Sequence, residues 1–504
     1  MTGSLATAMA SWIPLMPLLV VAVGGFALMI VDAVSTEKAE LATLSSVVLF
    51  SAGAIAAVLA SGKGLAPAPA GVAGYLAVGQ MSQFWNATIC CGAGMSALLA
   101  GGYLHEHALE RGEFYALIVL SAFGAMVLAA ATDLLSIFIG LETMSLGVYS
   151  MVAYRRGSPR AAEGGLKYFL LGSFAAAIFL FGAALIYGAT GHTDLAGIGQ
   201  SIHDGHANVR LVVLGMLMLL VGLTFKVSAV PFHMWTPDAY EGAVTPATTF
   251  MSVVVKTAAF AVLMRVVLTC FSDELSANLG TGWPGVLAPM AAVTMVYGNF
   301  AASQQANVKR MLAYSSIAHA GYILVGVVTL YSADAQVRQT AVSGVMFYLL
   351  AYTVSNVLAF GSLIALGSYG KEAVTYEDLA GAGRRHPLAA LPFVLGVLSL
   401  MGFPPTAGFL GKWYVFSAAL SSGDSLLWLV IVGVLSSVVG AYYYLRVIVF
   451  LFMKSPEPGA AVAVPMRSGY VALALVLSGY FVLKMGVTPA HYIDLALSAA
   501  SKLG

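Results

Sequence analysis

The sequence has 504 residues, of which 60% are hydrophobic and 9% are charged, and its formal net charge is +1. A soluble domain carries about 25% charged residues, so this composition excludes an ordinary water-soluble protein. The near-neutral charge gives no support for a nucleic-acid partner. Cys90, Cys91 and Cys270 lie in apolar runs and form no C-x-x-C pair. The sequence therefore predicts no thiolate metal or iron–sulfur site in this chain.

Apolar runs long enough to cross a bilayer, which requires about 20 residues, recur along the whole chain. The first run has no Lys or Arg before Lys38, so we interpret it as a retained first helix rather than a secretory signal. The fold class predicted is an all-α, polytopic membrane protein with about fourteen spans and no separate soluble domain. The predicted spans are 11–31, 41–60, 82–103, 114–132, 134–154, 166–189, 209–229, 247–270, 284–303, 309–330, 341–367, 389–420, 427–452 and 468–486.

Loops are expected at 62–79, 191–208 and 370–385, where turn-forming and polar residues gather. Lys and Arg are distributed unevenly between the loops, and cytoplasmic loops are normally enriched in them. The bias therefore predicts that both termini lie outside. The inside loops would hold Lys38, Arg111, Arg155, Arg156, Arg160, Lys309, Arg310, Lys371, Arg384, Arg385, Lys454 and Arg467. The outside would hold Lys63, Arg210, Arg265, Arg338, Lys484 and Lys502.

Two predicted spans are interrupted by proline. Pro231 follows the apolar run that ends at Val230, and Pro404 and Pro405 lie within the run 389–420. Proline removes a backbone donor, and freed backbone groups at membrane depth need protein or a water-filled cavity around them. Paired broken helices are typical of ion sites in transporters, whereas ordinary proline kinks are the alternative.

Four ionisable residues fall within the spans or beside the breaks: Glu142, Lys226, Lys256 and Lys412. A charge at the centre of a bilayer costs about 2.5–3.5 kcal/mol on insertion scales, so each of them requires an explanation. Burial and a nearby carboxylate act in opposite directions on the proton affinity of a lysine. A lysine with such a partner can therefore gain and lose a proton near neutral pH. The alternatives are a purely structural Glu142–Lys226 pair and lysines that extend toward the membrane interface.

Two histidines are further candidates for proton transfer. His233 follows the first break, and His319 lies within the predicted span 309–330. Each is either a relay or a core histidine with ordinary hydrogen bonds. Lys309 and Arg310, at the start of the same span, are interpreted as markers of the inner membrane interface.

Long strings of sequence surround these residues. They are LTFK at 223–226, VPFHMWTPDAYEG at 230–242, GLETMSL at 140–146, LAYSSIAHAGY at 312–322 and GFPPTAGFLGK at 402–412. Together they resemble the antiporter-like subunits of respiratory complex I, and most closely subunit N of the proton-pumping NADH–quinone oxidoreductase. The resemblance runs over nearly the whole chain.

The resemblance implies one transmembrane domain of fourteen helices with two inverted five-helix repeats, each containing a broken helix. The repeats would cover about 114–270 and 284–452. Residues 1–113 would add N-terminal helices, and 453–504 would add a C-terminal helix.

The resemblance also implies roles for the buried residues. Glu142 would pair with Lys226, Lys256 would link two half-channels, and Lys412 would lie in the second. His233 and His319 fall where relatives carry polar relay residues.

The implied function is a proton-translocating subunit of NADH–quinone oxidoreductase in a bacterial inner membrane, with both termini periplasmic. The chain would hold no cofactor, because NADH, FMN, iron–sulfur clusters and quinone would bind partner subunits. Expected partners are the antiporter-like subunit M, small subunits such as K and J, the peripheral arm and the lipid bilayer. The alternatives are a subunit of a cation/proton antiporter or hydrogenase-linked ion pump, and a structural membrane-arm anchor.

Overall fold

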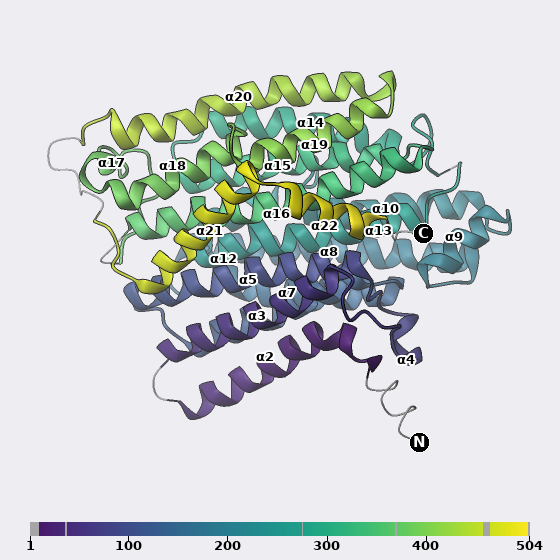
Figure 1. Ribbon diagram of the computed structural model, residues 1–504, viewed down its shortest axis with the longest axis horizontal. Helices are drawn as coiled ribbons and strands as arrows, with labels where there is room; N and C mark the ends of the chain where they lie inside the picture. The colour runs from purple at the N-terminus through teal and green to yellow at the C-terminus, as the bar shows by residue number, and fades with distance from the viewer. Residues whose placement is uncertain (1–9, 36–37, 275, 368–369, 457–463, 502–504) are drawn as a thin grey trace.

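The computed structural model describes residues 10–35, 38–274, 276–367, 370–456 and 464–501. Its helices run roughly side by side along the long axis of the molecule (Figure 1). Thirteen helical stretches in the described part of the chain are long and apolar enough to cross a membrane. The prediction of a polytopic all-α membrane protein is confirmed.

The N-terminal helices lie along one side of the molecule, in purple and blue in Figure 1. They are α2 (Met16–Val34), α3 (Ala39–Ala60), α4 (Ala70–Ala73) and α5 (Gln80–Glu106), with the short 3-10 turn Ile13–Leu15 before them. Almost every residue of α5 is buried, because α3, α6, α12, α16 and α21 all pack against it. This buried helix therefore carries Tyr103, near its C-terminal end, into the protein interior.

The next group of helices contains the first break, between α10 and α11. The group comprises α6 (Gly112–Ala130), α7 (Leu134–Val152), α8 (Pro159–Thr190), α9 (Leu195–His203), α10 (Val209–Val227), α11 (Trp235–Gly242), α12 (Thr245–Phe250) and α13 (Lys256–Thr269). One π-helical turn, Met251–Val255, joins α12 to α13. Lys256 follows this turn directly.

The third group contains the second break, between α18 and α19. It comprises α14 (Trp283–Ser303), α15 (Val308–Thr329), α16 (Ala335–Leu366), α17 (Ala382–Arg385), α18 (Pro387–Met401), α19 (Ala407–Ser421) and α20 (Leu427–Phe452), with the 3-10 turn Asp424–Leu426 before α20. Two helices follow, α21 (Gly469–Val487) and α22 (Ala490–Ala500). The C-terminal region thus holds a second helix beyond the single one expected.

Both breaks occur where the prolines predicted them. The residue that ends the first half-helix is left-handed in each case, Ser228 with φ 66° and Gly402 with φ 87°. Side chains satisfy the carbonyl groups that the breaks leave free. The Trp235 indole donates to the Phe225 carbonyl at 3.0 Å, and the Lys412 ammonium donates to the Met401 carbonyl at 2.9 Å.

The connections between helices gather at two opposite ends of the molecule. At one end, at the left of Figure 1 where α17 lies, the Val308 N–H donates to the Val374 carbonyl and the Gly381 N–H to the Phe450 carbonyl. We call this the basic end, because its described loops carry Lys38, Arg111, Arg155, Arg156, Arg160, Lys371, Arg384, Arg385 and Lys454. Lys502 lies outside the described residues.

The prediction of a loop at 191–208 is wrong, because this segment contains α9. The Asp194 side chain accepts a hydrogen bond from the Gly197 N–H at 2.7 Å, which caps the helix. Its residues Leu195 and Ile198 are buried against the rest of the protein. Its nine residues are too short and too rich in glycine for the helical period to stand out in the sequence.

Candidate functional site

Lys226 occupies an aromatic enclosure at the end of α10. Its side chain is 1% exposed, and its ammonium group donates to the Tyr149 hydroxyl at 3.1 Å. The same ammonium lies 5.1 Å from the centroid of the Tyr149 ring and 5.2 Å from that of Tyr168. Cation–π contact stabilises a desolvated ammonium by roughly 2 kcal/mol. The enclosure can therefore hold a charged lysine without a carboxylate in contact.

Glu142 lies two helical turns before Tyr149 on α7. Among the described residues no salt bridge joins it to Lys226, and its Oε1 atom is buried without a hydrogen-bond partner. Tyr149, on the same helix as Glu142, is instead the hydroxyl partner of Lys226. Glu142 and Lys226 therefore make no direct hydrogen bond among the described residues.

The face of α7 that carries Glu142 looks outward. Leu135, Ile139 and Leu146 share this face at helical spacing, and each is more than half exposed. A carboxylate beside an apolar stripe at membrane depth is costly unless another protein covers it.

Lys256 is buried at the centre of the molecule, 1% exposed. Its ammonium group donates to the backbone carbonyl of Ser316 on α15. The Ser316 hydroxyl in turn accepts a hydrogen bond from Tyr352 of α16 at 2.7 Å. Lys256 therefore points inward to another helix and does not extend toward an interface.

His319 lies one turn beyond Ser316 on α15 and is 2% exposed. Its Nδ1 atom is 2.8 Å from the Tyr348 hydroxyl, and its Nε2 atom is 3.1 Å from the Tyr444 hydroxyl. Both ring nitrogens thus have hydroxyl partners. Because a histidine can take a proton on one nitrogen and release one from the other, this geometry suits a relay.

Lys412 on α19 lies on the far side of His319. It is 8% exposed and donates to the Met401 carbonyl at 2.9 Å and to the Ser437 hydroxyl at 3.3 Å. Its ammonium also lies 4.7 Å from the centroid of the Tyr322 ring, one turn beyond His319 on α15. Lys256 of α13 and Lys412 of α19 therefore contact α15 one turn before and one turn after His319. We call Lys256, His319 and Lys412 the central line.

Aromatic rings separate Lys226 from the central line. Tyr168 and Trp235 stack with centroids 4.0 Å apart and an interplanar angle of 6°. Trp235 is followed by Tyr240, whose hydroxyl is 3.5 Å from the Ser316 hydroxyl. A rearrangement or an inserted water is therefore needed for a proton to pass from Lys226 to Lys256.

His233 lies apart from these contacts. It packs edge-on against Tyr297 with ring centroids 4.6 Å apart, and its Nδ1 atom is buried without a hydrogen-bond partner among the described residues. The structure brings Lys256, His319 and Lys412 together and leaves His233 outside the central line.

Lys309 lies at the start of α15, at the basic end, but its side chain is only 1% exposed. It forms a salt bridge of 3.7 Å with Glu372 and donates to the Ala243 carbonyl at 2.5 Å. Burial by itself raises the pKa of the Glu372 carboxyl, but the Lys309 charge and hydrogen bonds from Thr245 and Tyr103 outweigh it. The pKa of Glu372 therefore lies below its ordinary value. Sequence reasoning missed this pair because Glu372 lies in a loop, where carboxylates are common.

Arg310, by contrast, does lie near the surface of the basic end. Its guanidinium donates to Asp238 at 2.7 Å and to Glu241 at 2.8 Å. Lys167 of α8 also contacts Asp238 at 2.7 Å. This cluster ties α8, α11 and α15 together next to the first break.

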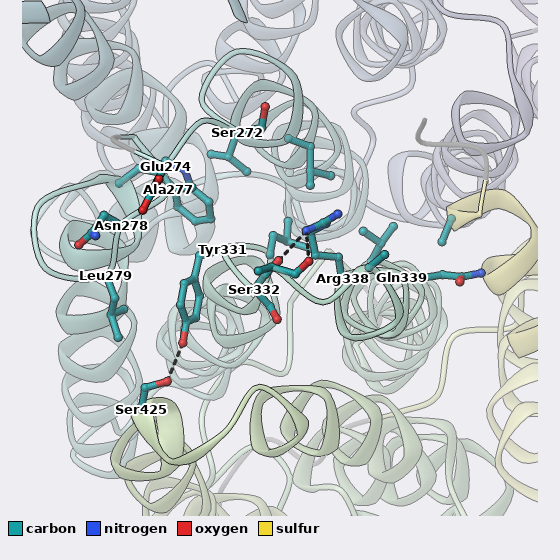
Figure 2. Close-up of a pocket in the computed structure, with 18 of the residues that line it drawn as sticks. Ser272, Glu274, Ala277, Asn278, Leu279, Tyr331, Ser332, Arg338, Gln339 and Ser425 are labelled. Atoms are coloured by element: carbon teal, nitrogen blue, oxygen red, sulfur yellow. Dashed lines mark hydrogen bonds between the residues drawn. The ribbon is translucent and has the colours of Figure 1, made fainter. Parts of the chain in front are cut away.

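A large cavity of about 1180 Å³ lies at the end opposite to the basic end (Figure 2). Arg338 donates to the carbonyls of Ser332 and Ala333 there, and the Tyr331 and Ser425 hydroxyls are 2.6 Å apart. None of the six predicted site residues lines it. The buried lysines therefore lie away from this cavity.

Comparison with known proteins gives consistent matches. Residues 131–440 match the family described as NADH:quinone oxidoreductase/Mrp antiporter, TM. NADH-quinone oxidoreductase subunit N 1 of Sorangium cellulosum (strain So ce56) is 52% identical, over 97% of this chain and 98% of the relative. A chain of respiratory complex I from Thermus thermophilus, solved with bound aureothin, superposes with a TM-score of 0.78 at 34% identity, over 95% of this chain and 99% of that one. A chain of the Mrp complex from Dietzia sp. DQ12-45-1b has the same fold, with a TM-score of 0.81 at 21% identity, over 98% and 97%.

Broken helices with buried lysines and a matching family together define a class, the antiporter-like membrane subunits. The chain belongs to the NADH:quinone oxidoreductase/Mrp antiporter family, because the match spans more than half of its length. Within that family it belongs with subunit N of NADH–quinone oxidoreductase, a membrane-arm subunit of the oxidoreductase complex. The resemblance stated from the sequence strings is confirmed.

Proposed function

We propose that this chain translocates protons across a bacterial inner membrane as a subunit of NADH–quinone oxidoreductase. The observation that carries the proposal is the central line. Its three residues are buried, and Lys256 and Lys412 contact α15 on either side of His319. Buried ionisable groups in a membrane interior are expensive, and a proton path accounts for them. NADH, FMN, iron–sulfur clusters and quinone belong to partner subunits, and the chain contributes no redox step.

Proton transfer along the central line needs only groups that exchange protons. A neutral Lys256 amine accepts a proton, and its ammonium, which donates to the Ser316 carbonyl, passes one toward the hydroxyls of the same serine and of Tyr352. His319 takes the proton on one ring nitrogen and releases another toward Tyr444 or Tyr348. Lys412 then holds the charge over the Tyr322 ring. The relay role of His233 stays a prediction.

Glu142 and Lys226 form the second element of the proposal. Loss of charge on Glu142 reduces the stabilisation of the Lys226 ammonium, since opposite charges favour each other's ionised form. Lys226 can then release its proton past the stack of Tyr168 and Trp235. Because the face of α7 that carries Glu142 is exposed, a partner subunit with complementary charge can change the charge on Glu142.

The partners proposed are the antiporter-like subunit M, small subunits such as K and J, and the peripheral arm. The covered face would include α7, whose outward stripe carries Glu142. We assign the basic end to the cytoplasm by the enrichment of Lys and Arg in cytoplasmic loops. Both termini would then be periplasmic.

We also propose that the two broken-helix groups are inverted repeats, at about 114–270 and 284–452. Four features support this: each group begins with a closely packed helix pair, α6 with α7 and α14 with α15, and each then has a 32-residue helix, α8 or α16. A broken helix follows in each, with Lys226 beside one break and Lys412 beside the other. An inverted repeat would give two half-channels that open to opposite sides.

The alternatives are a cation/proton antiporter subunit, a hydrogenase-linked pump and a structural anchor. The likeness to the Mrp complex rests on fold alone, at 21% identity, whereas the subunit N relative is 52% identical. These identities favour the NADH–quinone oxidoreductase assignment.

Replacement of Lys226 by Ala tests the proposal. NADH-driven proton uptake and quinone reduction would be measured in inverted membrane vesicles, with assembly checked on a native gel and the exposed loop residue Lys63→Ala as control. Loss of both activities in an intact complex supports the proposal. Normal pumping in Lys226→Ala would favour the anchor. Purification without a NADH-oxidising peripheral arm would favour an antiporter.

A further inference from the structure

The buried Glu372–Lys309 salt bridge lies at the boundary between water and the protein interior. Lys309 is 1% exposed, whereas the Glu372 side chain is 20% exposed. A cavity of about 130 Å³ at the basic end is lined by both residues and by Arg155, Arg160 and Glu241. Water can therefore reach the carboxylate from this end more readily than the nearly buried Lys309.

Glu372 is held in position from three directions. The Thr245 hydroxyl donates to its Oε1 atom at 2.6 Å, and the Tyr103 hydroxyl donates to the same atom at 2.7 Å. Its loop is also fixed, because the Val308 N–H donates to the Val374 carbonyl at 2.6 Å. A loop carboxylate with this many partners is a built site rather than a surface charge.

A row of buried hydroxyls leads from this carboxylate to Lys256. Thr245, Thr249 and Ser252 precede Lys256 at spacings of four, three and four residues along one continuous helix, and each is at most 2% exposed. Residues three and four apart lie on the same face of an α-helix, about 5–6 Å from each other, and the π-helical turn Met251–Val255 joins Ser252 to Lys256. We call these three residues the hydroxyl ladder. It covers about 16 Å from Thr245 to Lys256 at the rise of a helix.

We propose that Glu372 and Lys309 form the proton entry gate of this chain, and that the hydroxyl ladder carries protons from the gate to Lys256. This inference rests on the proposed function, because it gives the proton path its source. The gate lies at the basic end and opens to the compartment that this end faces.

The transfer is balanced in protons alone. A proton from water in the cavity adds to the Glu372 carboxylate, whose O–H then donates to the Thr245 oxygen in place of the reverse bond seen here. Thr245 releases its own hydroxyl proton toward Thr249 through an intervening water molecule, which the proposal requires at this step. Ser252 repeats the step, and the neutral amine of Lys256 accepts the final proton. Rotation of the hydroxyls restores the starting state.

Lys309 gives the gate its direction. Its ammonium remains held by the Ala243 carbonyl when Glu372 is neutral. The unpaired positive charge then opposes a second proton and favours renewed ionisation of Glu372 after the first has moved inward.

The test compares variants of the assembled complex in inverted vesicles. The ladder variant Thr249→Val is matched by Thr329→Val, since both threonines are fully buried and donate to a backbone carbonyl four residues earlier at 2.9 Å. Thr329 lies at the far end of α15. The gate variant is the double replacement Glu372→Gln with Lys309→Met, matched by the exposed Glu377→Gln in the same loop. Lys256→Ala serves as the reference for a blocked path.

We expect NADH-driven proton uptake in Thr249→Val and in the double variant to fall to the Lys256→Ala level, with assembly retained and both controls unchanged. The double variant removes both charges, so a purely structural salt bridge predicts normal uptake there. Normal uptake in either variant, while Lys256→Ala is inactive, would contradict the proposed gate and hydroxyl ladder but leave the proposed function standing. Normal uptake in Lys256→Ala itself would instead contradict the proposed function.

Discussion

The ammonium group of Lys226 donates its hydrogen bond to the Tyr149 hydroxyl, 3.1 Å away, and not to a carboxylate. Tyr149 shares its helix with Glu142, seven residues earlier. Tyr149 therefore belongs to the helix that carries Glu142 and also contacts the lysine beside the first helix break. This arrangement lets Glu142 change state without breaking a direct salt bridge.

Tyr149→Phe should slow proton uptake without preventing assembly. The substitution removes the hydroxyl acceptor but keeps the aromatic ring 5.1 Å from the ammonium. A buried ammonium that loses an acceptor is destabilised by about 1–3 kcal/mol. The measurement is NADH-driven proton uptake in inverted vesicles. Tyr187→Phe, which changes a tyrosine that is 55% exposed on α8, is the control. Equal rates for the two variants would exclude Tyr149 from the path.

His319→Gln should stop proton transfer between Lys256 and Lys412. Glutamine can keep one hydrogen bond to Tyr348 or Tyr444, but it does not bind a proton near neutral pH. His233→Gln should have a smaller effect, because His233 contacts Tyr297 outside the central line. Proton uptake per quinone reduced is the quantity to compare. An equal loss in both variants would place His233 in the path after all.

The Glu372–Lys309 pair should make stability depend on acid pH. The folded-state pKa of Glu372 is lowered, because the Lys309 charge and the hydrogen bonds from Thr245 and Tyr103 outweigh the effect of burial. Its stabilising contribution is therefore present above the ordinary carboxyl pKa of about 4.3 and is lost as the pH falls through the lower folded value. Thermal unfolding of the purified complex would be followed below about pH 5. The Glu372→Gln with Lys309→Met variant should show a smaller change, and an equal change would contradict the assignment.

Arg310→Ala should loosen the contact between α8, α11 and α15. It removes hydrogen bonds of 2.7 and 2.8 Å to Asp238 and Glu241. We expect the free energy of unfolding to fall by about 1–2 kcal/mol, since the groups are partly solvated. Arg160→Ala is the matched control, because Arg160 is 78% exposed and 3.9 Å from Glu241. The melting temperature in detergent distinguishes the two, and equal values would contradict a role for the cluster.

Much of the membrane architecture could be predicted from the sequence. Apolar runs predicted the spans because lipid requires continuous helices, and the prolines at 231, 404 and 405 located the breaks. Lys226, Lys256 and Lys412 stood out because a charge within an apolar run is rare. The exposed face of α7 was not evident, since a hydrophobic residue can face lipid or core alike.

The partners of the charged residues could not be predicted. Ser316, Tyr352 and Tyr444 are ordinary residues in apolar helices, and only the packing of α15 against α16 and α20 shows their contacts. Glu372 gave no signal, because its loop is far in sequence from Tyr103 and Thr245. Sequence patterns thus identified the charged groups within the apolar runs, but neither Glu372 in its loop nor the hydroxyls between the charged groups.

The most direct test of the account is the number of protons taken up per NADH oxidised in vesicles that carry Lys256→Met. Methionine fills a similar volume but holds no proton, and Lys256 lies between the hydroxyl ladder and His319. The account predicts that proton uptake by an assembled complex falls well below that of Lys63→Ala. Unchanged uptake per NADH would contradict a proton path through this chain.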